Sequence, residues 1–116
     1  MQKIEKWRLQ HLSHVLLKIS DLLTEGGNGE WGNVFKHFHH EAQHLATAGD
    51  LKLDGLHRFI SNVKNCFSGS SSLKNLTLSH KNAEKTEFLN RDYFKEKAML
   101  QRILNEIEEI SHEYKH

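Results

Sequence analysis

The chain contains no proline. Its glycines, together with a run of serines, cluster in three segments, residues 26–32, 49–55 and 68–72. Glycine readily adopts the left-handed backbone conformation that ends a helix, and a segment without proline keeps its backbone donors. Each segment between these breaks can therefore remain helical along its length. The pattern predicts an all-α fold of four helices. At 116 residues, the chain has the size of a single domain, which we expect to span residues 1–116.

Apolar residues recur every three or four positions within these segments, as expected of amphipathic helices. The first helix is predicted to end near Thr24, the second to span residues 30–48 and the third residues 53–67. Asp50 or Asp54 is the expected N-terminal cap of the third helix. The predicted inner faces comprise Ile4, Trp7, Val15, Leu16, Ile19, Leu22 and Leu23; Trp31, Val34, Phe35, Phe38, Ala42 and Leu45; and Leu53, Leu56, Ile60, Val63 and Phe67.

The longest irregular stretch is expected at residues 68–86, just before the last helix. Its serine-rich start has the composition of a flexible linker, whereas residues 73–78 fit a short strand, a helical turn or irregular chain. The last helix should begin between Asn82 and Asn90 and end near Tyr114. Its predicted inner face is Phe88, Leu89, Met99, Leu100, Ile103, Leu104, Ile107 and Ile110. Glu96 falls on this face, which indicates either a paired buried carboxylate or a shift in register.

Residues 40–44 read His-Glu-Ala-Gln-His and match the zinc-protease signature His-Glu-x-x-His. In such enzymes, two imidazoles four residues apart hold zinc from one helix face, and the glutamate polarises a zinc-bound water. The match therefore suggests a minimal zinc-dependent hydrolase that uses His40, His44 and Glu41. No third histidine follows Gly49 at the spacing found in metzincins.

Helix geometry argues against that enzyme. At about 100° per residue, His40, His44 and His37 lie about 180°, 220° and 240° from Trp31, whereas the other apolar residues of this helix lie near Trp31. The three histidines should thus form an exposed ridge that is either solvated or shared with a partner. If any metal binds, we expect it there and weakly; otherwise we expect no metal, no cofactor and no catalysis. Imidazoles beside a partner would make binding depend on pH.

Composition limits the other classes of function. A net charge of +1 gives no strong field for nucleic acid or an anionic membrane, so we expect neither as a partner. No apolar run approaches the ~20 residues that span a bilayer, and the first ten residues lead directly into an amphipathic helix. The single cysteine, Cys66, excludes an internal disulfide framework and fits a core position in a reducing compartment. We expect a cytoplasmic protein.

Several landmarks resemble a family of small, mostly uncharacterised bacterial helical domains. They are Trp31 at the start of the second helix, the run Phe-Ser-Gly-Ser-Ser-Ser-Leu-Lys-Asn-Leu at residues 67–76, and Asn82 followed by the helix through Tyr93 and Leu100. Family members carry more glycine in the serine-rich run and an Asn-Asp pair before its last leucine. Such small helical proteins are similar to the immunity proteins of contact-dependent inhibition and other bacterial toxin systems.

This resemblance implies a binding protein that neutralises one cognate toxin domain by covering its active site or substrate channel. We expect that domain to be a nuclease. Inhibitors of nucleases often present carboxylates where the enzyme holds phosphate. Glu106, Glu109 and Glu113 lie on one side of the last helix and are candidates for this role together with the histidine ridge, although any solvent-facing helix carries such charges. We expect a monomer in the complex. A third alternative is a regulatory module that dimerises through Phe94, which lies off the apolar stripe.

Overall fold

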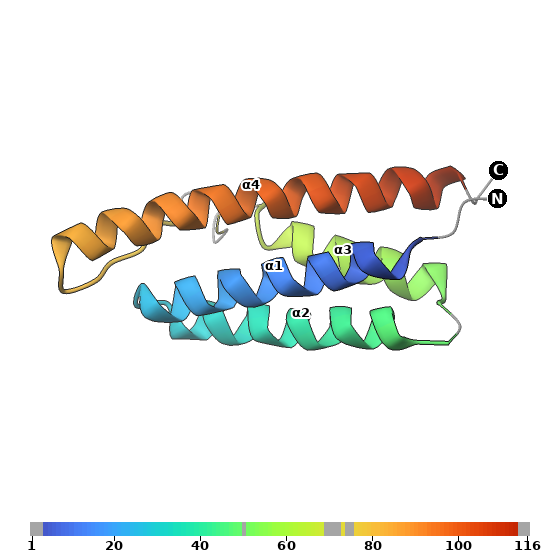
Figure 1. Cartoon of the computed structure of the whole chain (residues 1–116), viewed down its shortest axis with the longest axis horizontal. Helices are drawn as coiled ribbons and strands as arrows, with labels where there is room; N and C mark the ends of the chain where they lie inside the picture. The colour runs from blue at the N-terminus through green and yellow to red at the C-terminus, as the bar shows by residue number, and fades with distance from the viewer. Residues whose placement is uncertain (1–3, 50, 69–72, 74–75, 114–116) are drawn as a thin grey trace.

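The computed structural model describes residues 4–49, 51–68, 73 and 76–113, and in these ranges it contains four α-helices and no strand. The helices are α1 (Lys6–Glu25), α2 (Gly29–Thr47), α3 (Leu53–Asn65) and α4 (Ala83–Glu113) (Figure 1). The predicted all-α, four-helix fold is confirmed, and the predicted ends of the first three helices are close to the observed ones. No helix in the described ranges has the length and hydropathy needed to cross a membrane.

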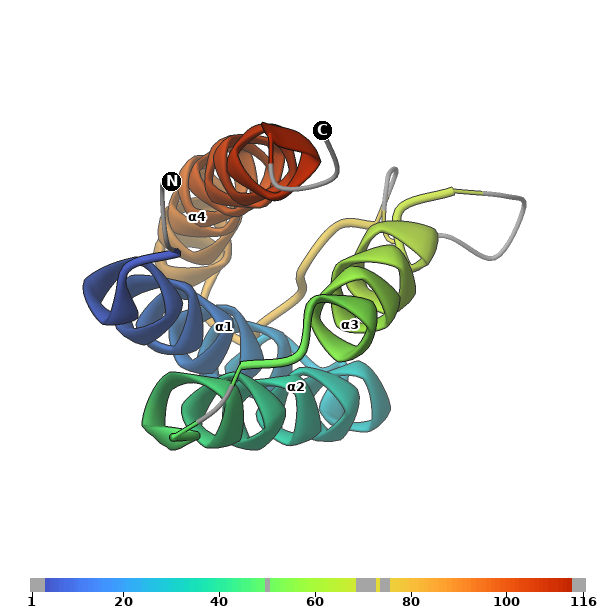
Figure 2. The same ribbon diagram turned by 90° about the vertical axis from the view of Figure 1, so that its right-hand side faces the viewer.

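The helices α1 and α2 form an antiparallel pair, and α4 runs antiparallel to α1 along its other side (Figure 1). Seen end-on, α3 lies beside α2 and faces α4 across the interior (Figure 2). The turn between α1 and α2 requires glycine, because Gly27 has φ +84°. A Cβ atom at Gly32 would lie 3.1 Å from the Ser20 carbonyl oxygen, so glycine also permits the close approach of these two helices.

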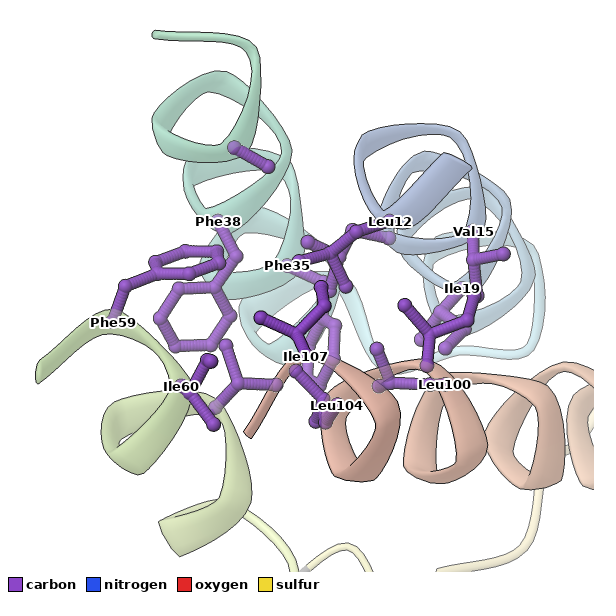
Figure 3. Packing of buried hydrophobic residues seen from close by; sticks show 14 of the residues in the cluster. Leu12, Val15, Ile19, Phe35, Phe38, Phe59, Ile60, Leu100, Leu104 and Ile107 are labelled. Carbon is purple, nitrogen blue, oxygen red and sulfur yellow. The ribbon is translucent and has the colours of Figure 1, made fainter. Parts of the chain in front are cut away.

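All four helices contribute side chains to one core (Figure 3). The Phe38 ring packs edge-on against Phe35 at 5.4 Å and against Phe59 at 5.9 Å between ring centroids, which joins α2 to α3. Burial of each such side chain contributes about 1.5–3 kcal/mol before the entropy of ordering is subtracted. The remaining labelled members of this core in Figure 3 are Leu12, Val15 and Ile19 of α1, Ile60 of α3, and Leu100, Leu104 and Ile107 of α4.

Three residues predicted to face inward are exposed, so these predictions are wrong. Trp7 is 51% exposed, Phe88 55% and Val34 38%. Trp7 precedes the buried Leu16 by nine residues, or about two and a half helical turns, and therefore lies on the opposite face of α1. Phe88 immediately precedes the buried Leu89 and is turned about 100° away from it.

The predicted cap of α3 is also wrong for Asp54. The N-cap residue is Lys52, which makes no side-chain capping bond, and Asp54 lies within the first helical turn. Asp50 lies outside the described residues. In contrast, α4 begins within the predicted interval, where the Asn82 side-chain oxygen accepts hydrogen bonds from the backbone N–H groups of Glu84 at 2.9 Å and Lys85 at 3.2 Å.

The described end of the connection before α4 is irregular and firmly attached to the bundle. The Asn90 side chain accepts a hydrogen bond from the Leu78 N–H at 2.7 Å and donates one to the Leu78 carbonyl at 3.0 Å. The Ser79 N–H donates to the Gly26 carbonyl at 3.0 Å. Both Leu73 and Leu78 are buried. Of the alternatives for residues 73–78, a helical turn fits Leu73, which has 3₁₀ geometry and whose carbonyl accepts a hydrogen bond from the Leu76 N–H at 3.2 Å. Residues 76–80 are irregular, and residues 69–72, 74 and 75 lie outside the described ranges.

Ion pairs join α1 to α4 along their length. Lys18 pairs with Glu96 at 3.7 Å, and Lys85 pairs with Glu25 at 2.7 Å. The Glu96 side chain is only 15% exposed and is paired with Lys18. Of the two alternatives for this residue, a paired carboxylate is therefore the one observed, and α4 continues past it without a shift in register. The Lys85 ammonium holds the pKa of Glu25 below its ordinary value.

Candidate binding surface on α2

The histidine ridge consists of His37, His40 and His44, and all three are exposed on α2. The prediction that they point away from the core is confirmed, while Phe35 and Phe38 on the same helix are buried. An imidazole can both donate and accept hydrogen bonds, so the ridge presents polar groups that can bind another surface.

A fourth histidine of α2, His39, points into the protein, which the sequence alone does not predict. Its Nδ1 atom lies 2.7 Å from the Ser13 carbonyl oxygen and 2.8 Å from the Ser13 hydroxyl oxygen. Ser13 and His39 are both buried, so these contacts satisfy polar groups between α1 and α2. The pairing of α1 with α2 places them together, and helical periodicity within either segment cannot reveal it.

The three residues of the zinc-protease signature, His40, Glu41 and His44, do not point toward a common metal position. The Glu41 carboxylate lies 2.9 Å from Nε2 of His37, one turn earlier on the helix, and these side chains are 40% and 74% exposed. Within the described part of the chain, no group of three or more His, Cys, Asp or Glu side chains is placed to hold a metal ion. His40 and His44 thus lie on an open helix face.

Two hollows in the surface border His44 on its two sides. The first, of about 630 Å³, lies between α1 and α2 and is lined by Gln10, His40, Gln43, His44, Ala46 and Thr47. The second, of about 270 Å³, lies between α2 and α3 and is lined by Glu41, His44, Leu45, Gly55 and Phe59. Gln10 and Gly55 could not be placed here from sequence, because their positions depend on how α1 and α3 pack against α2. The ridge therefore stands between two depressions that can receive side chains.

The carboxylates proposed as a second binding face have different surroundings. Glu106 pairs with Arg8 of α1 at 3.2 Å and with Arg102 at 3.4 Å. Glu109 is exposed on α4, and the Glu113 side chain lies outside the described residues. These positions are on α4, whereas the histidine ridge is on α2, at the other side of α1 (Figure 1). The structure therefore does not bring the two predicted sets of residues together.

Cys66 is half-buried after α3, and burial raises the pKa of its thiol. A raised pKa reduces the thiolate fraction and with it the reactivity of the cysteine. The Cys66 sulfur lies 3.5 Å from the Asn62 carbonyl oxygen, which accepts from the thiol. These features fit the packing role expected from the sequence.

Comparison with protein-family models, curated proteins and solved structures gives no match to this chain.

Proposed function

We propose that this protein is an immunity protein of a bacterial toxin system, such as contact-dependent growth inhibition. In this proposal it binds one cognate toxin domain, a nuclease, in the cytoplasm and covers the active site or substrate channel. The protein acts by occupying that site and not by catalysis. The proposal combines the family resemblance with the chemistry of the exposed α2 surface.

The observation that supports it most is the position of His44 between the two hollows. Stable protein interfaces concentrate their binding energy in a few side chains that fill pockets on the partner and are sheltered from water. The hollows on either side of His44 are open depressions that side chains of a partner can enter and cover, and the imidazoles provide orienting hydrogen bonds. Because the three imidazoles lie on one helix of the folded bundle, little backbone conformational entropy is lost when a partner binds.

Deletion of the gene from the source bacterium tests this function. Cells without the protein should lose in a contact-dependent competition against the parental strain, because the parental toxin is no longer neutralised. They should survive beside a parental strain from which the toxin gene has also been removed. If the deletion strain grows equally well beside both competitors, the protein does not confer immunity.

The zinc-hydrolase alternative makes a different prediction. It requires one tightly bound zinc ion per chain and a strong loss of activity in the Glu41→Gln variant. In an immunity protein, the zinc content of the purified protein should be well below one ion per chain. Metal analysis together with the competition assay separates the two functions.

A further inference from the structure

The outer face of α4 carries two large hydrophobic side chains that the fold leaves uncovered. Phe88 is 55% exposed and Phe94 is 54% exposed. In both views the other three helices of the described ranges lie on one side of α4 (Figures 1 and 2). Exposed aromatic side chains next to arginine are typical of protein interfaces.

Phe88, Arg91 and Phe94 follow one another at steps of three residues and form a ridge along the outer face of α4. Phe88 and Phe94 lie about 60° to either side of Arg91 around the helix axis. The Lys97 ammonium lies 4.8 Å from the Phe94 ring centroid and borders the ridge at its C-terminal end. We call these three residues, Phe88, Arg91 and Phe94, the α4 ridge.

The charges beside the α4 ridge are ordered along the helix. Acidic Glu84 and Glu87 come first, and basic Arg91 and Lys95 follow. All four side chains are exposed. The Arg91–Glu87 pair is 3.4 Å long, and its side chains are 73% and 77% exposed, so it contributes little and can rearrange. These two acidic and two basic side chains balance in charge, so this face has no positive field that would favour nucleic acid.

We infer that the α4 ridge is the interface of a homodimer in which two copies of α4 pack antiparallel about a two-fold axis near Arg91. In this arrangement Phe88 comes level with Phe94 of the second copy, because each lies three residues from Arg91. Glu87 comes level with Lys95 of the second copy, because each lies four residues from Arg91. A parallel arrangement would instead bring acidic beside acidic and basic beside basic residues.

In a two-fold homodimer the same surface of both copies is in contact, so this surface must be complementary to itself. The antiparallel arrangement meets this requirement because it brings unlike charges of the two copies level with each other. Around the axis, the two Arg91 guanidinium groups remain beside two Glu87 carboxylates, which offset their repulsion. The proposed dimer is an alternative to the monomer expected from sequence. It also leaves the histidine ridge accessible, because α2 and α4 lie at opposite sides of the molecule (Figure 1). The inference is therefore independent of the proposed immunity function.

Sedimentation velocity over a concentration series of the full chain tests the dimer. The wild-type protein should pass from monomer to dimer as its concentration rises. The Phe88→Gln and Phe94→Gln variants should each weaken the dimer about 30-fold or more, as for an interface hot spot. Val34→Gln, which changes an exposed hydrophobic residue on α2, should leave the dimer unchanged. A wild-type monomer up to millimolar concentration overturns the proposal, as does an unchanged dimer in the phenylalanine variants.

Charge reversal tests the register. Glu87→Lys and Lys95→Glu should each weaken the dimer about fivefold, and the double variant should restore it because the pairs re-form with their signs exchanged. In the double variant, the pairing within each helix is preserved. Arg91 loses the carboxylate at position 87, one turn before it, and gains one at position 95, one turn after it. Failure of the double variant to recover association contradicts the antiparallel register.

Discussion

Arg8 near the start of α1 and Glu106 near the end of α4 form an ion pair of 3.2 Å that joins helices from opposite ends of the sequence. The Arg8 side chain is 23% exposed and that of Glu106 46%, so the pair is partly sheltered from solvent. Glu106 was a candidate for partner binding, but its carboxylate has a structural role that Glu109 on the same helix lacks.

Glu106→Gln should therefore destabilise the protein more than Glu109→Gln. We expect a loss of about 1 kcal/mol for Glu106, because its removal leaves Arg8 without this partner, and less than about 0.5 kcal/mol for Glu109. Urea unfolding at low salt measures both, and the difference should shrink as salt is added. Equal effects of the two substitutions would show that the Arg8 pair contributes nothing to stability.

Two neighbouring histidines on α2 should behave very differently. His39→Ala should lower the free energy of unfolding by about 2 kcal/mol, because it removes a buried ring and its contact with Ser13. His40→Ala changes an exposed side chain and should cost less than about 0.5 kcal/mol. Thermal or urea unfolding compares them directly. Similar losses in both variants would contradict the inward orientation of His39.

Tyr93 should make stability depend on pH at the alkaline end. Burial raises its pKa from 10.0 to about 12. Below about pH 10 the phenol is protonated in both states, and its contribution to stability is fully present. Between about pH 10 and 12 the unfolded chain releases a proton that the folded chain keeps, so the free energy of unfolding falls as pH rises.

In the Tyr93→Phe variant, the fall in the free energy of unfolding caused by ionisation of Tyr93 should be absent. Urea unfolding of both proteins between about pH 9 and 12 measures the difference, and the lysines, common to both, serve as the internal control. The free energy of unfolding of the wild type should fall relative to that of the variant as the pH rises through this interval. Curves that stay parallel would mean that Tyr93 ionises alike in the folded and unfolded chains.

Most of the fold could be predicted because glycine positions and apolar periodicity are local properties of the sequence. The errors at Phe88 and Trp7 have different causes. Phe88 borders the apolar stripe of α4, so only the packing of α4 against α1 decides whether it is covered. Trp7 lies opposite the buried Leu16, so its exposure follows from helix geometry and did not require the packing to be known. Periodicity also found the outward direction of His40 and His44, since this depends on a single helix.

The remainder of the candidate site depends on contacts between helices. Gln10 reaches the hollow beside His44 because α1 packs antiparallel to α2, and Glu106 meets Arg8 because α4 runs antiparallel to α1. The local pattern of residues does not show how α1 is aligned with α2 or how α4 is aligned with α1. Sequence could therefore identify the histidine ridge but not the hollows beside it or the internal pairing of Glu106.

The most direct test of the account is whether His44 is needed for protection when the fold is intact. His44→Glu places a charge between the two hollows, whereas His11→Glu makes the same change at an exposed histidine of α1 outside the hollow linings. Each variant is expressed in the deletion strain, and survival is measured in competition with the parental strain. We predict that His11→Glu protects fully and that His44→Glu, equally folded by circular dichroism, fails to protect. Full protection by His44→Glu would contradict the assignment of this surface to partner binding.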